Sequence, residues 1–157
     1  VLVDLPNVTE LGESVFGNCS NLTTVNLPAL KKMNASSFSG TSSLKKIYLP
    51  ELVEITGYGY SFNNSSIEKA VFPKLTSKIQ GYDFTSCRYL TTLVLGANTV
   101  VPLTATNAFN SNTPIAKGTG YIYVPRAQLE AYKTATNWST LASQFRAIED
   151  YPGIMEV

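Results

Sequence analysis

The sequence predicts a repeat solenoid that is mostly β, with about five coils of 22–25 residues and a small α-helical cap at its C-terminal end. Two observations support this fold class. One seven-residue motif recurs at a nearly fixed interval, and the hydrophobic pattern changes from a strand period to a helix period after Val124. We expect residues 1–124 to form the solenoid and residues 125–157 to form the helical cap and tail of the same domain.

The recurring motif places apolar residues at its first, fourth and sixth positions and usually ends in proline. Its clear copies are Leu22–Pro28, Leu44–Pro50, Ile67–Pro73 and Leu90–Gly96. The intervals between their first residues are 22, 23 and 23 positions. Alternation within a copy indicates a strand, because side chains of a strand point to opposite faces in turn. In the first of these copies we expect Val25 and Leu27 to face inward, and Thr24 and Asn26 to face solvent.

Each repeat contains two further apolar features. A pair of apolar residues follows the strand and predicts a second inward-facing side, at Val8/Leu11, Leu30/Met33, Leu52/Ile55 and Leu75/Ile79. A phenylalanine then precedes a small polar turn, at Phe16, Phe38, Phe62, Phe84 and Phe109. No single coil can bury its own apolar face, so neighbouring coils must stack. The stacking predicts a continuous row of phenylalanines.

The last part of the chain has a helical pattern. Arg126–Thr136 carries alanines at a spacing of four, which favours a helix. Asn137 is the expected N-cap of a second short helix that begins with Trp138. We expect Trp138 to cover the apolar end of the last coil. Arg146–Glu149 is then expected to be extended, and Tyr151–Val157 to form a tail.

Composition argues against several classes of function. The chain has no histidine, which removes the commonest general base and the commonest metal ligand. Its carboxylates are scattered and no glycine-rich phosphate loop follows a strand, so we expect no enzyme activity, no cofactor and no metal site. A net charge of +1 gives no strong field for nucleic acid. No apolar run approaches the length of a membrane span, so no membrane insertion is expected within this segment.

The two cysteines occupy the same phase of the repeat. Cys19 and Cys87 lie three repeats apart, which corresponds to roughly 14 Å in a stack of parallel strands. A disulfide requires Cα atoms within about 7 Å of each other. We therefore predict two buried free thiols, in a ladder that Thr41 and Asn64 occupy in the intervening repeats.

Several segments carry a resemblance to a known family. Gly12–Phe16 followed by Cys19–Leu22, and also Cys87–Leu90, fit a pattern of phenylalanine, a small turn that often holds Cys-Ser, and leucine. With the proline-ended strands and the ending Ile122–Pro125, the chain resembles the BspA-like leucine-rich repeats of bacterial cell-surface proteins. The resemblance implies a cell-surface or extracellular module that contributes to adhesion or to host-protein contact. It supplies no catalytic residue.

The outward-facing strip of the strands is the first candidate site. Its members combine aromatic, β-branched and basic side chains, which suit a host or matrix protein as partner. They are Tyr48, Val71, Val94, Tyr121, Tyr123, Lys46 and Lys69. The alternative is that these side chains only stabilise pairing between strands.

A loop in the third repeat is the second candidate site. Tyr58 and Tyr60 alternate with glycines there, and Tyr82 follows in the next repeat. Exposed tyrosines could stack on a sugar ring, so the alternative function is a carbohydrate-binding module. The rings could instead fold back over the neighbouring coil. A third possibility is a passive spacer within a larger surface protein.

Overall fold

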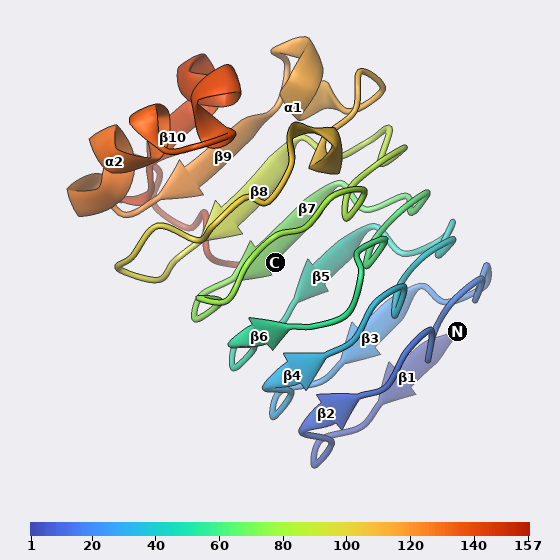
Figure 1. Ribbon diagram of the computed structural model, residues 1–157. Coiled ribbons are helices and arrows are strands. Elements are labelled where there is room, and N and C mark those ends of the chain that lie inside the picture. The colour runs from blue at the N-terminus through green and yellow to red at the C-terminus, as the bar shows by residue number, and fades with distance from the viewer.

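The computed structural model describes all 157 residues. Most of its strands are short, run parallel and are stacked in two rows (Figure 1). The first row contains β1 (Leu2–Asp4), β3 (Thr24–Asn26), β5 (Lys46–Tyr48), β7 (Lys69–Phe72), β8 (Thr92–Leu95) and β9 (Tyr121–Val124). The second row contains β2 (Glu10–Leu11), β4 (Lys32–Met33) and β6 (Glu54–Ile55). Strands of one repeat pair in parallel with the equivalent strands of the next repeat. The predicted mostly β repeat fold is confirmed at this level.

Pairing in the first row follows the predicted register. Lys46 pairs with Lys69, Lys69 with Thr92, and Thr92 with Tyr121. Tyr48 likewise pairs with Val71, Val71 with Val94, and Val94 with Tyr123. A shift of one residue would turn every inward side chain outward, so the buried face fixes this register.

The first row is interrupted between its second and third repeats. The strands β1 and β3 form one two-stranded sheet, whereas β5, β7, β8, β9 and β10 (Phe145–Ala147) form a separate five-stranded sheet. The strands β3 and β5 are neighbours without a hydrogen-bonded ladder between them.

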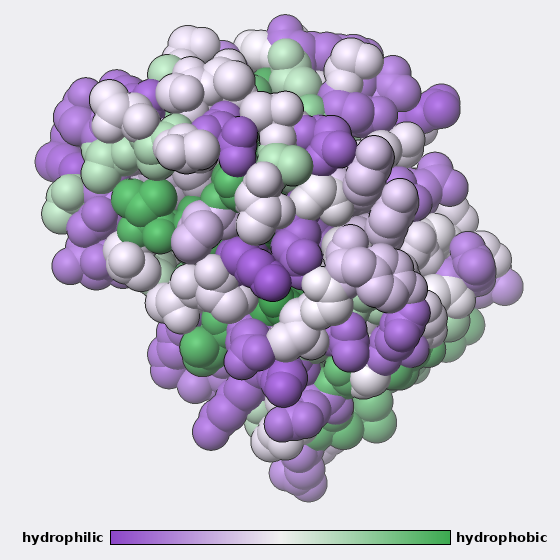
Figure 2. Space-filling view, viewed as in Figure 1, coloured by the Kyte–Doolittle hydropathy of each residue, from purple (hydrophilic) through white to green (hydrophobic).

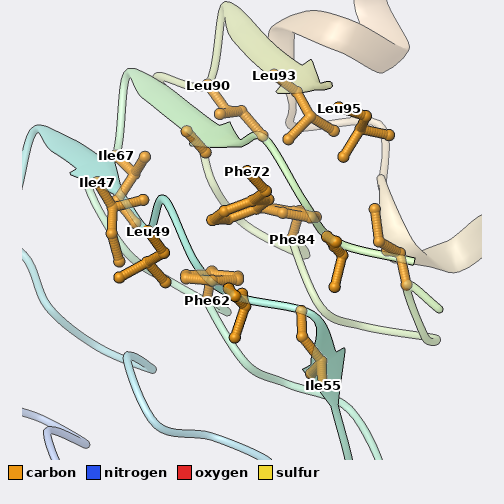
Figure 3. Close-up of a cluster of buried hydrophobic side chains, with 14 of the residues drawn as sticks. Ile47, Leu49, Ile55, Phe62, Ile67, Phe72, Phe84, Leu90, Leu93 and Leu95 are labelled. Carbon is orange, nitrogen blue, oxygen red and sulfur yellow. The ribbon is translucent and has the colours of Figure 1, made fainter. Parts of the chain in front are cut away.

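The core lies between the two rows and contains 33 buried apolar side chains (Figure 3). The first row contributes leucine and isoleucine from one side, and the second row contributes Leu11, Met33 and Ile55 from the other. The five repeat phenylalanines stack in order, with ring centroids 5.4, 5.8, 5.1 and 5.2 Å apart. The predicted row of phenylalanines is therefore confirmed.

The turn after each of the first four repeat phenylalanines has a left-handed residue at its second position. Asn18, Gly40, Asn64 and Ser86 all have positive φ, a conformation that favours glycine and asparagine. The prediction that Asn64 belongs to the cysteine ladder is wrong by one residue. Ser65 takes that place, and its Oγ lies 3.5 Å from the Sγ of Cys87.

Both cysteines are free, as predicted, but only Cys87 is buried. Cys19, in the first repeat of the sequence, is half-buried. The thiol of Cys87 donates to the carbonyl of Phe62 at 3.0 Å. Burial raises the pKa of Cys87 to about 11, so this thiol stays protonated at neutral pH.

The fifth repeat is expanded and irregular. Leu103 forms an isolated parallel bridge with Ile79 of the fourth repeat, outside the sheet of the second row. The helices η1 (Thr106–Ala108) and α1 (Pro114–Lys117) follow it. Thr113 caps α1, because its side-chain oxygen accepts the backbone N–H of Ala116 at 3.1 Å.

The C-terminal segment contains four short helices. They are η2 (Arg126–Gln128), α2 (Leu129–Thr134), η3 (Trp138–Gln144) and η4 (Ile148–Asp150). The ring of Trp138 lies 5.9 Å from that of Phe109, and its Nε1 donates to the carbonyl of Val101 at 2.6 Å. Tyr132 packs beside Trp138, and burial raises its pKa to about 12.

Three details of this segment differ from the prediction. Of Arg146–Glu149, which was predicted to be extended, only Arg146 and Ala147 lie in β10, whereas Ile148 and Glu149 belong to η4. The first predicted helix is divided into η2 and α2. The side chain of Asn137 does not cap η3; its Nδ2 donates instead to the carbonyl of Leu103 at 2.7 Å. The side chain of Asn137 is therefore bonded to a carbonyl of the fifth repeat, although the local sequence predicts that it caps the helix.

Candidate binding surfaces

The C-terminal tail, residues 151–157, covers part of the outer face of the first row. In Figure 1 the chain ends near β7, well away from the helices that precede the tail. Val71, Val94 and Tyr123 form a small buried cluster, against which Ile154 and Met155 pack.

Tyr151 completes this cover at the β9 side. Its ring meets the Tyr123 ring edge-on, with centroids 5.0 Å apart and an interplanar angle of 77°. The prediction that Val71, Val94 and Tyr123 are exposed on an open face is wrong. They point outward from the sheet as predicted, but the tail buries them.

The tail makes no backbone–backbone hydrogen bonds to the sheet and is held by contacts that involve side chains. Its backbone N–H groups bond locally, for example Ile154 to the carbonyl of Tyr151 at 3.0 Å. Lys69 of β7 donates its Nζ to the carbonyl of Glu156. Burial lowers the pKa of Lys69, the neighbouring Lys46 lowers it further, and Glu156 opposes both effects.

Tyr121 is half-buried at the far end of the same strip. The guanidinium of Arg146, on β10, lies over its ring at 4.5 Å from the centroid. This contact and the tail together close the strip from β7 to β9. Of the seven residues predicted for protein binding, only Lys46 and Tyr48 remain exposed.

A groove with a volume of about 470 Å³ occupies the outer face beside the covered strip. Thr24 and Asn26 line one side of it, and Lys46 and Tyr48 line the other. It therefore lies over the interruption between β3 and β5. Val157 of the tail contributes to one wall, and Tyr48 is 42% exposed.

The three loop tyrosines lie together on a different part of the surface. The rings of Tyr60 and Tyr82 stack with centroids 4.9 Å apart and planes within 5° of parallel. Tyr58 meets Tyr60 at 6.5 Å and 64°, and its hydroxyl donates to the carboxylate of Glu13. This hydrogen bond raises the pKa of Tyr58. We call Tyr58, Tyr60 and Tyr82 the tyrosine stack; the predicted grouping of these residues is observed.

Sequence reasoning missed the tail and Glu13 as parts of these surfaces. The apolar residues Ile154, Met155 and Val157 were a signal that the tail packs against another part of the protein. Nothing in the local sequence links Glu13 to Tyr58, because they are 45 positions apart.

Apolar side chains are also exposed in the first repeat. In Figure 2 apolar atoms gather at the end of the molecule where β1 and β2 lie. Val1, Leu2 and Val15 of the first repeat are among its exposed side chains. No helix combines the length and the apolar character required to cross a bilayer.

A comparison with protein families agrees with the repeat geometry. The family model described as BspA type leucine-rich repeat region matches residues 3–116 in six copies. Comparisons with curated proteins and with solved structures gave no match. The match covers most of the chain and coincides with the parallel strands and the phenylalanine row. The chain therefore belongs to the BspA-type leucine-rich repeat family.

Proposed function

We propose that this chain is a non-enzymatic interaction module of a bacterial cell surface, located there or outside the cell, that binds a protein partner. In this proposal the repeats form one continuous solenoid, and residues 125–150 cap its last coil. Family membership supports the surface role. The contact of Trp138 with Phe109 supports the cap.

The partner would bind at the groove between β3 and β5, and this groove is the observation that carries the proposal. Tyr48 offers an aromatic surface, Lys46 a cation, and Thr24 and Asn26 hydrogen-bonding groups. Aromatic residues are enriched in protein interfaces, because a rigid ring gives a large contact area at little entropic cost. The interrupted ladder also leaves strand backbone groups of β3 and β5 unpaired beside the groove.

The chemistry of the buried ionisable groups favours binding over catalysis. Asp83 is buried, and its two carboxylate oxygens accept the backbone N–H groups of Gln80 at 2.7 Å and Ser61 at 3.0 Å. Its role is thereby structural. Cys87 is a poor nucleophile because its raised pKa keeps it protonated, and its sulfur bonds to Ser65 and the carbonyl of Phe62.

Surface plasmon resonance against a panel of host extracellular-matrix proteins would test the proposal. The matrix fragments are produced in bacteria, so that they carry no glycans. Tyr48→Ala is compared with Tyr82→Asn, because Tyr48 and Tyr82 are both 42% exposed. We expect at least one fragment to bind and Tyr48→Ala to weaken that binding about tenfold or more.

Tyr82→Asn should leave that affinity unchanged. The proposal fails if no fragment binds. It also fails if Tyr48→Ala binds as tightly as the unmodified chain.

A further inference from the structure

The tyrosine stack occupies a strained position of the repeat. The residue two places before the repeat phenylalanine has left-handed backbone in four repeats, with φ of 56° at Ser14, 58° at Ser36, and 63° at both Tyr60 and Tyr82. For a residue with a side chain this conformation costs about 1–2 kcal/mol. Serine meets the requirement of the fold in the first two repeats. The fold alone therefore does not explain two bulky tyrosines at this position.

Core burial does not explain the tyrosines either. Tyr82 is 42% exposed, Tyr58 is 62% exposed and Tyr60 is half-buried, and none of the three belongs to the buried core cluster. The near-parallel contact at 4.9 Å fixes the rings of Tyr60 and Tyr82. Within the stack only the hydroxyl of Tyr58 is hydrogen-bonded to another side chain of the protein. The result is a rigid aromatic surface with two phenolic hydroxyls available.

Two buried polar atoms without partners lie next to the stack in the chain. They are the Oγ of Ser61, which follows Tyr60, and the Nε2 of Gln80, which precedes Tyr82 by two residues. They are the sole buried side-chain polar atoms of the chain that lack a hydrogen bond. Such atoms are uncommon in folded proteins, so each requires an explanation.

We propose that the tyrosine stack is a binding site for a neutral pyranose sugar. The C–H face of a pyranose is flat and apolar, and it matches the face of an aromatic ring. The sugar hydroxyls can exchange hydrogen bonds with the phenolic hydroxyls of Tyr60 and Tyr82. Glu13 is the charged group bonded to the stack, and its carboxylate disfavours anionic sugars. This site is separate from the groove at Tyr48, so the inference does not depend on the proposed protein partner.

Isothermal titration calorimetry with defined oligosaccharides tests this site. The probes are cellotetraose, laminaritetraose and mannotetraose, with sialyllactose as the anionic comparison. Tyr82→Asn removes the ring while keeping a residue that tolerates left-handed backbone. We expect at least one neutral tetrasaccharide to bind, and Tyr82→Asn to weaken its binding about tenfold or more.

Two further variants separate stacking from other effects. Tyr82→Phe keeps the ring and should stay within about threefold of the unmodified chain. Tyr48→Ala changes only the groove and should bind the sugar normally. Circular dichroism checks that each variant is folded.

Three outcomes would overturn the inference. They are the absence of binding to every neutral probe, equal binding by folded Tyr82→Asn, and tighter binding of sialyllactose than of the neutral sugars. Failure here leaves the matrix-protein experiment at Tyr48 unaffected, because its fragments carry no glycans.

Discussion

The outer face of the first row has two halves with the same repeat geometry and opposite exposure. On the half formed by β1, β3 and β5, the outward ladder contains Asp4, Asn26 and Tyr48, and all three side chains are exposed. On the half formed by β7, β8 and β9, the same ladder contains Val71, Val94 and Tyr123, and all three are buried. Position within the repeat is equal in the two halves, so it does not decide exposure. The tail decides it.

The side chains of the two halves differ in a way that fits this division. On the open half, the side chain of Asn26 donates to the carboxylate of Asp4 at 2.8 Å, and this polar pair is exposed to solvent. Valines replace such polar residues where Ile154 and Met155 cover the sheet. The open half is therefore the part of this face that can meet a partner, and the covered half contributes to stability.

Removing residues 151–157 should have the largest effect on this difference. The deletion exposes three outward side chains, and we expect the free energy of unfolding to fall by about 3–5 kcal/mol. Urea unfolding followed by circular dichroism measures the change. The dye ANS should bind more strongly to the shortened chain, because the covered half becomes an exposed apolar strip. A loss below about 1 kcal/mol would contradict the burial of the cluster.

A matched pair of substitutions should show a smaller difference. Val94→Asn places a polar amide under the tail, and we expect it to lower the free energy of unfolding by about 2–3 kcal/mol. Tyr48→Asn makes the equivalent change on the open half and should lower it by less than about 1 kcal/mol. Urea unfolding of both variants checks the prediction, and equal losses would show that the two halves are equally exposed.

The titration of Lys69 should have the smallest effect on the free energy of unfolding. Burial lowers the pKa of Lys69 from its ordinary value of 10.5. The folded state therefore holds this proton less tightly than the unfolded chain. Stability should increase slightly as pH rises from the lowered pKa toward 10.5. NMR titration of the lysine side chains measures the pKa.

The tail deletion provides the control for this titration. It should return the pKa of Lys69 toward 10.5, because it removes part of the burial. A Lys69 pKa that is unchanged by the deletion would show that the tail does not desolvate this amine.

Repeat-level features were predictable from sequence because each is repeated. The strand register and the phenylalanine row follow from spacing, and one buried face is enough to fix them. The family resemblance rests on the same repeated residues, and the family match confirms it.

Features that occur once were not predictable in the same way. The tail contacts residues that are far away in the chain. Glu156 of the tail, for example, accepts a hydrogen bond from Lys69, which lies 87 positions before it. The side-chain amide of Asn137 donates to the carbonyl of Leu103, 34 positions away, and makes no capping hydrogen bond at the adjacent helix. The interruption between β3 and β5 has no signature, because Leu22–Pro28 and Leu44–Pro50 both read as ordinary copies of the motif.

Tyrosine modification resolved by mass spectrometry tests most directly the claim that the tail closes one half of this face. Tetranitromethane reacts with exposed tyrosines through the phenolate. Tyr48 is 42% exposed, whereas Tyr123 is 8% exposed and burial raises its pKa. We expect rapid modification of Tyr48 and protection of Tyr123 in the intact chain, with Tyr123 becoming reactive once residues 151–157 are removed. Modification of Tyr123 as fast as that of Tyr48 in the intact chain would contradict the account.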